Sequence, residues 1–188
     1  MTLLLTKISL EQNPCLLDEA INVIYQDSNF LRSSYPLFDQ WFTQKVLPGI
    51  YSGERTLLIE KRASLAVAYL ILKHTSTEKK LCTLRVRPNY ESKGLGVRLF
   101  QTAFELLETE RPLLSVSEPA VPKFERIFKY FAFAQEAAYK GRYIPMINEF
   151  AYNGLLDHLP LGPETFGFPT HSAPFGTSQT ADIPALNA

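Results

Sequence analysis

Cysteine is scarce in this sequence of 188 residues, which contains only Cys15 and Cys82. The two are far apart, and neither belongs to a Cys-x-x-Cys or Cys/His cluster with the spacing of a zinc site. A chain of this length buries enough surface to fold without disulfides. Two isolated thiols also fit a reducing compartment. We therefore expect a cytoplasmic protein that holds no metal.

Long apolar runs and an excess of one charge are missing as well. The N-terminal run Leu3–Leu5 is shorter than the core of a signal peptide, and no run approaches the roughly 20 residues of a membrane-spanning helix. No membrane is therefore expected as a partner. Nineteen basic residues balance nineteen acidic ones. Without a net positive field, a nucleic acid is disfavoured as a partner.

The apolar pattern predicts an α/β (α+β) domain over residues 1–154. Helical spacing begins after Asn13-Pro14 and returns over Pro36–Val46, where Pro48-Gly49 is expected to end the helix. The residues between, from Gln26 to Ser34, are expected to be irregular. Strands are predicted at 55–61, 65–73, 81–86, 113–117, 136–139 and 148–152, with helices at 94–108 and 121–133.

The last part of the sequence has a different composition. Five of the thirteen prolines lie between Pro160 and Pro184, among serine, threonine and glycine. Such a segment has too few apolar residues to form a core of its own. We expect residues 155–188 to be a C-terminal tail outside the folded domain.

The segment from Leu84 to Leu99 combines a strand, a loop that starts at Pro88, and a helix that opens on Gly94-Leu95-Gly96. The first turn of a helix has unpaired N–H groups at the positive end of the helix dipole, and these bind a phosphate well. Glycine lets the anion approach closely and tolerates a positive φ angle. The segment therefore predicts a phosphate site.

Other phosphate-binding loops fit these residues less well. A dinucleotide-binding fingerprint would have its first glycine directly after the strand and a third glycine where Leu99 stands. A Walker A loop would need Gly-Lys followed by Ser or Thr. The Gly-x-Ser-x-Gly elbow of many serine hydrolases is also missing.

The same segment resembles the signature of the GNAT superfamily of N-acetyltransferases, which is Gln or Arg, two residues, Gly, one residue, and Gly or Ala. The spacing here is Glu91-x-x-Gly94-x-Gly96, after a Val86-Arg87-Pro88 step. The order of predicted elements over residues 1–154 is similar to the family's. The resemblance implies a GNAT-like fold, with a mixed, mostly antiparallel sheet of six to seven strands and about four flanking helices. It also implies that the sheet is splayed between strands four and five.

The resemblance implies acetyl-CoA as a cosubstrate and assigns residues to it. The backbone groups of Leu84 and Val86 would hold the pantetheine arm. The pyrophosphate would lie on the amides of Glu91, Ser92, Lys93, Gly94, Leu95, Gly96 and Val97, with Lys93 and Arg98 adding charge at the rim. Glu91 stands where the family has Gln or Arg, so its side chain must point to solvent or to a basic neighbour. Ser92 stands where glycine is frequent.

Acetyl transfer to an amine needs a base, and usually an acid that protonates the departing thiolate. In the family the acid is often a tyrosine, but the matching residue here is Phe128. Tyr143 and Tyr130 are the candidate acids in its place. The alternative for each is a structural role, in which the ring packs and the hydroxyl contacts water. Glu118, directly after the strand expected at 113–117, is the candidate base, at what would be the fifth strand of the family. Its alternative is an exposed carboxylate beside Pro119.

The resemblance therefore implies an N-acetyltransferase that moves an acetyl group directly from acetyl-CoA to a primary amine. The region that would hold the acceptor carries aromatic residues and arginines, namely Phe30, Tyr35, Phe38, Trp41, Tyr51, Tyr143, Arg32, Arg85 and Arg87. This composition suits a small amine or amino-acid-like acceptor that carries a carboxylate, with a protein amine as an alternative. A homodimer stays open.

Two other functions stay open at this point. The departures at Glu91, Ser92 and Phe128 allow a catalytically silent, GNAT-like regulatory module that binds acyl-CoA. An acetylating toxin that acts on aminoacyl-tRNA is the third alternative, which the balanced charge makes less favourable.

Overall fold

The computed structural model describes residues 1–157, apart from the side chains of Ser28 and Phe30. Most of the expected C-terminal tail lies outside the described residues. The strands are β1 (Thr2–Leu5), β2 (Arg55–Arg62), β3 (Leu65–His74), β4 (Lys79–Val86), β5 (Leu114–Ser117), β6 (Gln135–Lys140) and β7 (Asn148–Tyr152). The α-helices are α1 (Lys7–Gln12), α2 (Cys15–Ser34), α3 (Phe38–Trp41), α4 (Leu47–Ser52), α5 (Leu95–Leu107) and α6 (Val121–Tyr130), and a π-helical segment (Phe42–Val46) joins α3 to α4.

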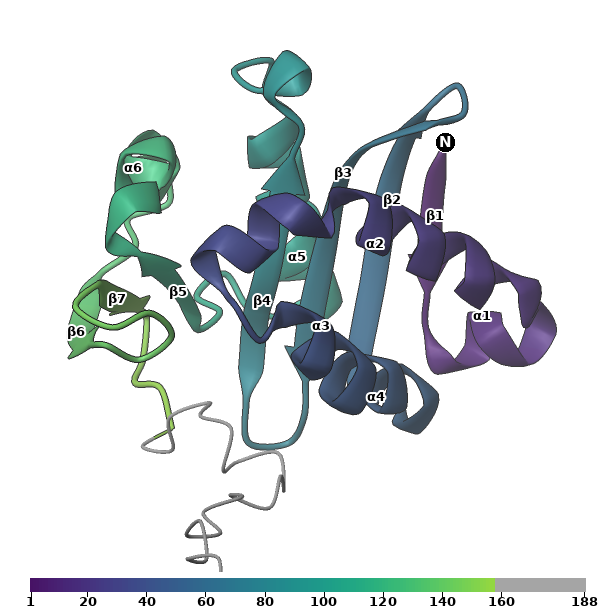
Figure 1. The fold of residues 1–188 in the computed structure, drawn as a ribbon, viewed down its shortest axis with the longest axis horizontal. Coiled ribbons are helices and arrows are strands. Elements are labelled where there is room, and N and C mark those ends of the chain that lie inside the picture. Colours follow the sequence, from purple (N-terminus) through teal and green to yellow (C-terminus); the bar gives the residue numbers. More distant parts are fainter. Residues whose placement is uncertain (158–188) are drawn as a thin grey trace, which may run out of the picture.

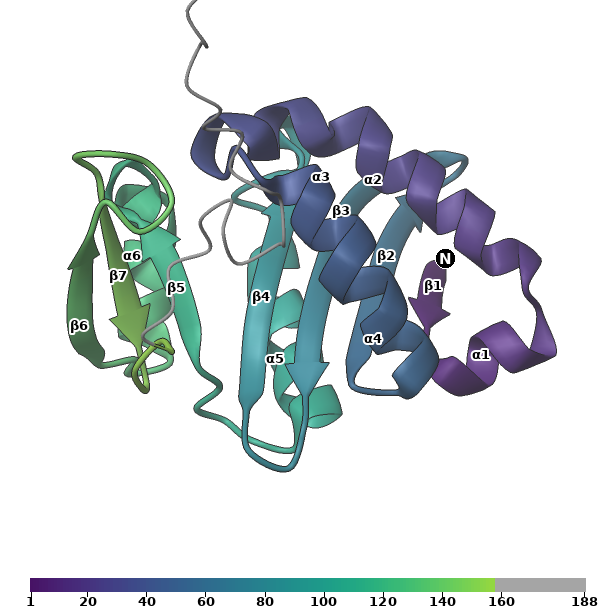
Figure 2. The same ribbon diagram turned by 60° about the horizontal axis from the view of Figure 1, so that its bottom comes forward.

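The strands form two antiparallel sheets that meet at one point. The larger sheet has the order β1-β2-β3-β4, and the smaller one has the order β5-β7-β6. Within residues 1–157 the pairing between β4 and β5 is a single parallel bridge, Lys80 with Leu113. Figure 1 and Figure 2 show the two strands running apart from this end. The α/β fold expected from the sequence is confirmed, and its splay lies between strands four and five of the structure, as the family resemblance implied.

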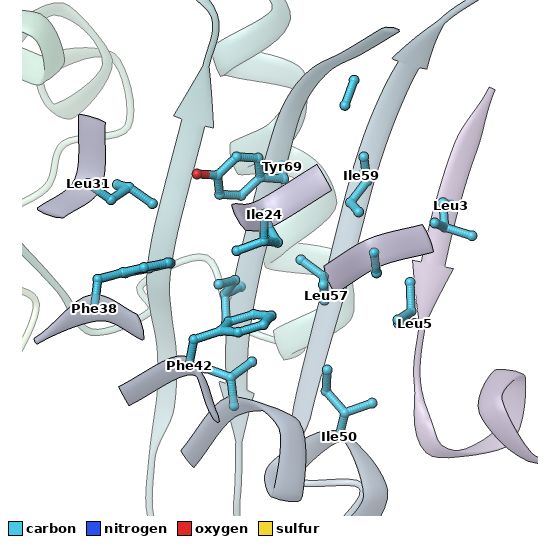
Figure 3. Packing of buried hydrophobic residues seen from close by; sticks show 14 of the residues in the cluster. Leu3, Leu5, Ile24, Leu31, Phe38, Phe42, Ile50, Leu57, Ile59 and Tyr69 are labelled. Carbon is cyan, nitrogen blue, oxygen red and sulfur yellow. The ribbon is translucent and has the colours of Figure 1, made fainter. Parts of the chain in front are cut away.

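Helices cover both faces of the larger sheet. Figure 2 shows α2, α3 and α4 on one face and α5 on the other. On the α2 side, Ile24, Phe42, Leu57 and Tyr69 belong to one buried cluster, part of which is drawn in Figure 3. Tyr69 is 2% exposed, and its hydroxyl has no hydrogen-bond partner in the described structure.

The second buried cluster joins α5 and α6 to the opposite face of β3 and β4. The apolar stripe predicted for α5 is buried, with Leu95, Leu99, Ala103 and Leu107 facing the sheet. Phe100 extends this stripe into a cluster of rings, and its neighbours are Phe104, Phe128, Phe131 and Phe133. This aromatic contact fixes the small sheet and α6 to the end of the large sheet.

Two predictions about the first helices were wrong. The stretch from Gln26 to Ser34 is the second half of α2 and not an irregular segment. Leu31 is buried there against the α2-side cluster, and such packing outweighs the weak helix propensity of Asn, Asp and Ser. The next helix also continues past Pro48, because the π-helical segment ends just before it and Pro48 occupies the first turn of α4. Proline is tolerated in the first turn of a helix, because the N–H that it lacks would have no intrahelical partner there.

Replacement of Phe100 by alanine is expected to lower the free energy of unfolding by roughly 3–5 kcal/mol, because a large ring would be lost from a packed cluster. The phenylalanine is 1% exposed. Urea denaturation would measure the loss. Tyr51→Ala is the matched control, since Tyr51 is 57% exposed and should cost much less. Equal losses for the two variants would show that the ring cluster does not stabilise the fold.

Candidate cofactor and acceptor site

The loop before α5 turns sharply at two residues with a positive φ angle. Ser92 has φ 58° and Gly94 has φ 76°, and α5 begins directly afterwards at Leu95. The serine thus occupies the left-handed conformation that glycine adopts without strain. A Cβ at Gly94 would meet no atom within 4 Å, so its φ angle is what requires a glycine.

These turns leave a row of backbone donors unpaired. In the described part of the chain no backbone or side-chain acceptor receives a hydrogen bond from the amides of residues 92–97. The first hydrogen bond of α5 runs from the Arg98 amide to the Gly94 carbonyl oxygen, at 3.2 Å. Three of the six amides belong to the first turn of the helix, where the dipole favours an anion. The row can therefore hold a diphosphate.

The charged side chains around this loop leave most of the unpaired amides of residues 92–97 uncovered. Lys93 turns back and donates from Nζ to the Asn89 carbonyl oxygen at 2.9 Å, above the ring of Tyr90. Arg98 is exposed. Glu91 Oε1 lies 4.0 Å from Arg85 Nη1, so the acidic side chain is directed toward a basic neighbour. This orientation meets the condition that the sequence set for Glu91.

Gly96 has a different role from Gly94. A Cβ on Gly96 would lie 3.1 Å from Cδ1 of Ile127, which is on α6. The glycine thus lets α5 and α6 approach closely. A large substitution at Gly96 would therefore disturb the packing of α6 as well as the loop, and Arg98 offers a cleaner test of anion binding.

The edge of β4 next to this loop is not paired with a neighbouring strand. The Arg87 amide donates to the Val67 carbonyl oxygen of β3 at 2.9 Å. Because successive residues of a strand direct their backbone groups to opposite edges, those of Val86 and Leu84 point away from β3, toward the splay. Leu84 and Val86 are the two residues that the sequence assigned to the pantetheine arm.

Arg85 links this edge to helix α2. The side chain is 8% exposed, with Nε 3.3 Å from Asp27 Oδ2 and Nη1 2.8 Å from the carbonyl oxygen of Val86. Arg87 reaches the other oxygen of Asp27 at 3.7 Å. Asp27 is thus held between two arginines of β4. The network connects α2, the free edge of β4 and Glu91 of the phosphate loop.

A second polar group lies across the splay, on the small sheet. Phe150 and Tyr152 of β7 pack on the α6 side, so Glu149 belongs to the opposite face. Ser117 of β5 is its partner across the strands. Glu149 is 2% exposed. Tyr35, which ends α2, donates from its hydroxyl to Glu149 Oε1 at 3.4 Å.

Tyr143 completes this group from the connection between β6 and β7. Its ring lies edge-on to Tyr35, with 5.2 Å between the ring centroids. Arg142 stacks over the same ring, with Cζ 5.7 Å from its centroid. Tyr143 therefore contacts the tyrosine that donates to the buried carboxylate.

Burial changes the acid–base properties of this group. Loss of hydration raises the pKa of Glu149 to about 7, while hydrogen bonds from Ser115 and Tyr35 and the charges of Lys80 and Arg142 act in the opposite direction. Burial also raises the pKa of the Tyr35 hydroxyl, and the nearby Glu149 adds to this. Glu149 therefore exchanges a proton close to neutral pH, while Tyr35 stays protonated.

The other two predicted catalytic residues are exposed, although Glu118 contacts Asn148, the residue before Glu149. Glu118 is on the surface, and its Oε2 accepts from Asn148 Nδ2 at 3.0 Å. Tyr130 is 68% exposed on α6, where its ring contacts Phe131. Phe128 is buried between rings, including that of Tyr152 at 4.3 Å. Of the three candidates, Tyr143 is the one that contacts Tyr35, the hydrogen-bond partner of Glu149.

The predicted aromatic wall divides into core and surface. Phe38 and Trp41 pack against each other in the α2-side cluster. Tyr51 is exposed, and Arg32 pairs with Asp39 at 2.7 Å. The side chain of Phe30 lies outside the described residues. Only Tyr35 and Tyr143 of the predicted aromatic residues come together at the splay.

Sequence reasoning missed Glu149 and Asp27. One sign of Glu149 was available, because it alternates with Phe150 and Tyr152 in a predicted strand and shares a face with the fully buried Ala151. A carboxylate on a buried face needs an explanation. Asp27 could not be found, because the segment around it was not expected to be helical.

Among residues 1–157 no helix has the length and apolarity needed to cross a bilayer. The same residues contain no group of three or more His, Cys, Asp or Glu side chains placed to hold a metal ion.

No known protein family matches this chain, and neither does any curated protein. Solved structures of similar fold include a GNAT family acetyltransferase from Elizabethkingia anophelis with acetyl-CoA bound (13% identity, TM-score 0.45, 58% of this chain and 82% of that one). An acetyltransferase from Bacillus subtilis in complex with CoA has 12% identity and a TM-score of 0.47, over 61% of this chain and 86% of that one. The spermidine/spermine N-acetyltransferase of Vibrio cholerae, in mutant forms, has 15% identity and a TM-score of 0.46 (61% and 74%). With TM-scores below 0.5, the function has to be argued from the site itself.

Replacement of Glu149 by glutamine is expected to change how stability depends on pH. The pKa of about 7 lies above the ordinary value of 4.5, so the native state binds this proton more tightly than the unfolded chain. Wild-type stability should therefore fall as pH rises from 4.5 to 7 and stay level above that. Glutamine removes this fall, and the variant should be more stable at pH 8 by up to about 3 kcal/mol.

Urea denaturation at pH 5, 6.5 and 8 would measure the difference. The two proteins should be nearly equally stable at pH 5. A difference that is the same at all three values would mean that Glu149 has an ordinary pKa.

Proposed function

We propose that the protein is an acetyl-CoA-dependent N-acetyltransferase that moves an acetyl group directly to a primary amine. The observation that carries the proposal is the row of unpaired amides at residues 92–97, which ends in the first turn of α5. A diphosphate is the ligand that such a row binds best. The diphosphate of CoA fits because the free edge of β4 begins next to this row.

The free edge of β4 supports an extended arm after the diphosphate. Pantetheine has two amide groups, and the backbone groups of Leu84 and Val86 can pair with them as a neighbouring strand would. The arm would then carry the thioester into the splay between β4 and β5. The acyl-CoA-binding domain comprises residues 1–154 in this proposal, with a cytoplasmic location that fits two free cysteines.

The group around Glu149 favours catalysis over a silent module. A buried carboxylate is costly to fold around, and a binding module has no need of one. In this proposal acetyl-CoA binds along β4 of the larger sheet, whereas Glu149 belongs to the smaller sheet. The two substrates can therefore be held on opposite sides of the splay, facing each other. Tyr143 is the proposed acid, because its ring packs against Tyr35, whose hydroxyl donates to Glu149. A small amine or an amino-acid-like acceptor is the proposed second substrate.

Charge reversal at Arg98 is expected to weaken acetyl-CoA binding at least tenfold, because a negative side chain would stand at the mouth of the phosphate loop. Isothermal titration calorimetry with acetyl-CoA would measure the dissociation constant. Arg111→Glu is the matched control, since Arg111 is an exposed arginine beyond the other end of α5. If wild-type protein binds no acetyl-CoA, or if Arg98→Glu binds as tightly as the control, the site is wrongly placed.

Replacement of Tyr143 by phenylalanine is expected to lower kcat by about 10²-fold, the effect of losing a general acid, with little change in acetyl-CoA affinity. The assay is thiol release from acetyl-CoA with a panel of primary amines. Tyr130→Phe is the comparison, because this tyrosine is mostly exposed on α6. A loss of kcat in Tyr130→Phe with none in Tyr143→Phe would assign the acid to the other tyrosine.

A further inference from the structure

We propose that Glu149 is the base that takes the proton from the acceptor amine, and that Tyr35 positions it. The site would thereby select acceptors that arrive as ammonium ions. The inference rests on the proposed function and names the chemistry of its acceptor side. Its basis is a carboxylate that is 2% exposed, beside the splay, with a tyrosine hydroxyl 3.4 Å from one of its oxygens.

The surroundings of Glu149 leave its charge only partly compensated. The charged and titratable groups that act on it are Lys80 from β4, Arg142 from the connection between β6 and β7, and Tyr35 from the end of α2. None of the ion pairs in the described structure includes Glu149. A cation brought by a ligand would complete the site, because a buried carboxylate is stabilised mainly by a paired charge.

The position of Glu149 suits an acceptor that approaches from the α2 side. Ser115 and Ser117 of β5 share its polar face, whereas Leu114 and Val116 point into the α5–α6 core. On β4, Arg85 belongs to the same side as Tyr69, its partner on β3. The faces of β4 and β5 on this side are thus both polar where the strands separate. β7 lies one strand spacing, about 4.8 Å, beyond β5, so the base can act directly or through one water.

The chemical step balances without any further reactant. The acceptor enters as R–NH₃⁺, and Glu149 takes one proton, which leaves a neutral amine. The nitrogen lone pair attacks the thioester carbonyl carbon, the C–N bond forms and the C–S bond breaks. The thiolate leaves with the bonding pair and takes its proton from Tyr143. The amine nitrogen loses its second proton, and of the two protons that it has given up, one restores Tyr143 and the other goes to solvent, so that Glu149 is again ionised. The products are the amide, CoA as a thiol, and one proton in total.

Tyr35 has the role of a positioning residue. Its hydroxyl donates to the ionised form of Glu149 and so lowers the pKa of the carboxyl, opposing the effect of burial. Without that hydrogen bond the pKa of Glu149 rises further. The acid limb of the rate profile would then move to higher pH, whereas a tyrosine that only fills space would leave the limb where it is.

The first experiment follows the Glu149 carboxyl directly by ¹³C NMR, assigned by its loss in Glu149→Gln. Butylammonium is added to the CoA-loaded protein, with 1-butanol as the neutral control. The amine should lower the pKa of Glu149 by about one unit, as a nearby opposite charge does, and the alcohol should not. An unchanged titration with saturating amine overturns the proposal, whether or not an acceptor for turnover is known.

The second experiment uses acetyl transfer to an amine panel. Glu149→Gln should lower kcat at least 10²-fold while acetyl-CoA still binds as in the wild type. Tyr35→Phe should move the acid limb up by about half a pH unit or more. Glu136→Gln, an exposed glutamate on β6, should leave both unchanged.

These outcomes distinguish a failure of the proposed function from a failure of the base assignment. If acetyl-CoA does not bind, the proposed function fails. If acetyl-CoA binds and transfer proceeds in Glu149→Gln at the wild-type rate, only the assignment of the base fails. Loss of transfer in Glu118→Gln with none in Glu149→Gln would return the base to the residue that the sequence indicated.

Discussion

The hydrogen bonds of Leu113 determine how the two sheets of this protein meet. Its amide donates to the Lys79 carbonyl oxygen and its carbonyl oxygen accepts from the Leu81 amide, each at 2.9 Å. Beyond this bridge the described chain has no pairing between β4 and β5. A central strand that loses its neighbour exposes donors and acceptors that need partners. The free edge of β4 and the opening between the sheets both depend on where this pairing stops.

The two faces of that opening have opposite character. On the side of α5 and α6, rings around Phe100 hold the small sheet in place by burial alone. On the side of α2, charged and hydroxyl groups meet, including Asp27, Arg85, Tyr35 and Glu149. The apolar face provides the stability that offsets the cost of burying these groups. A rigid core on one side thus supports a polar, titratable surface on the other.

The sequence predicts β2 to β7 and α5 well, because periodicity and turn-forming residues are local properties, whereas β1 was not predicted. The splay came from the family resemblance of the loop before α5. Glu149 was missed, because its burial depends on Tyr35, which is 114 residues away. The second half of α2 was missed for a similar reason, since Leu31 and Asp27 are held by contacts with the sheet. Local propensity alone does not contain such contacts.

Arg85 touches helix α2 through Asp27, the strand edge through the Val86 carbonyl oxygen and the phosphate loop through Glu91. A pantetheine amide that pairs with the Val86 carbonyl oxygen would compete with this guanidinium and shift it. Thermodynamic reciprocity then applies: whatever factor the first substrate imposes on the affinity of the second, the second imposes on the first. In the proposed enzyme, Arg85 would thereby couple the binding of acetyl-CoA to the binding of the acceptor, and the order in which they bind would depend on its contacts.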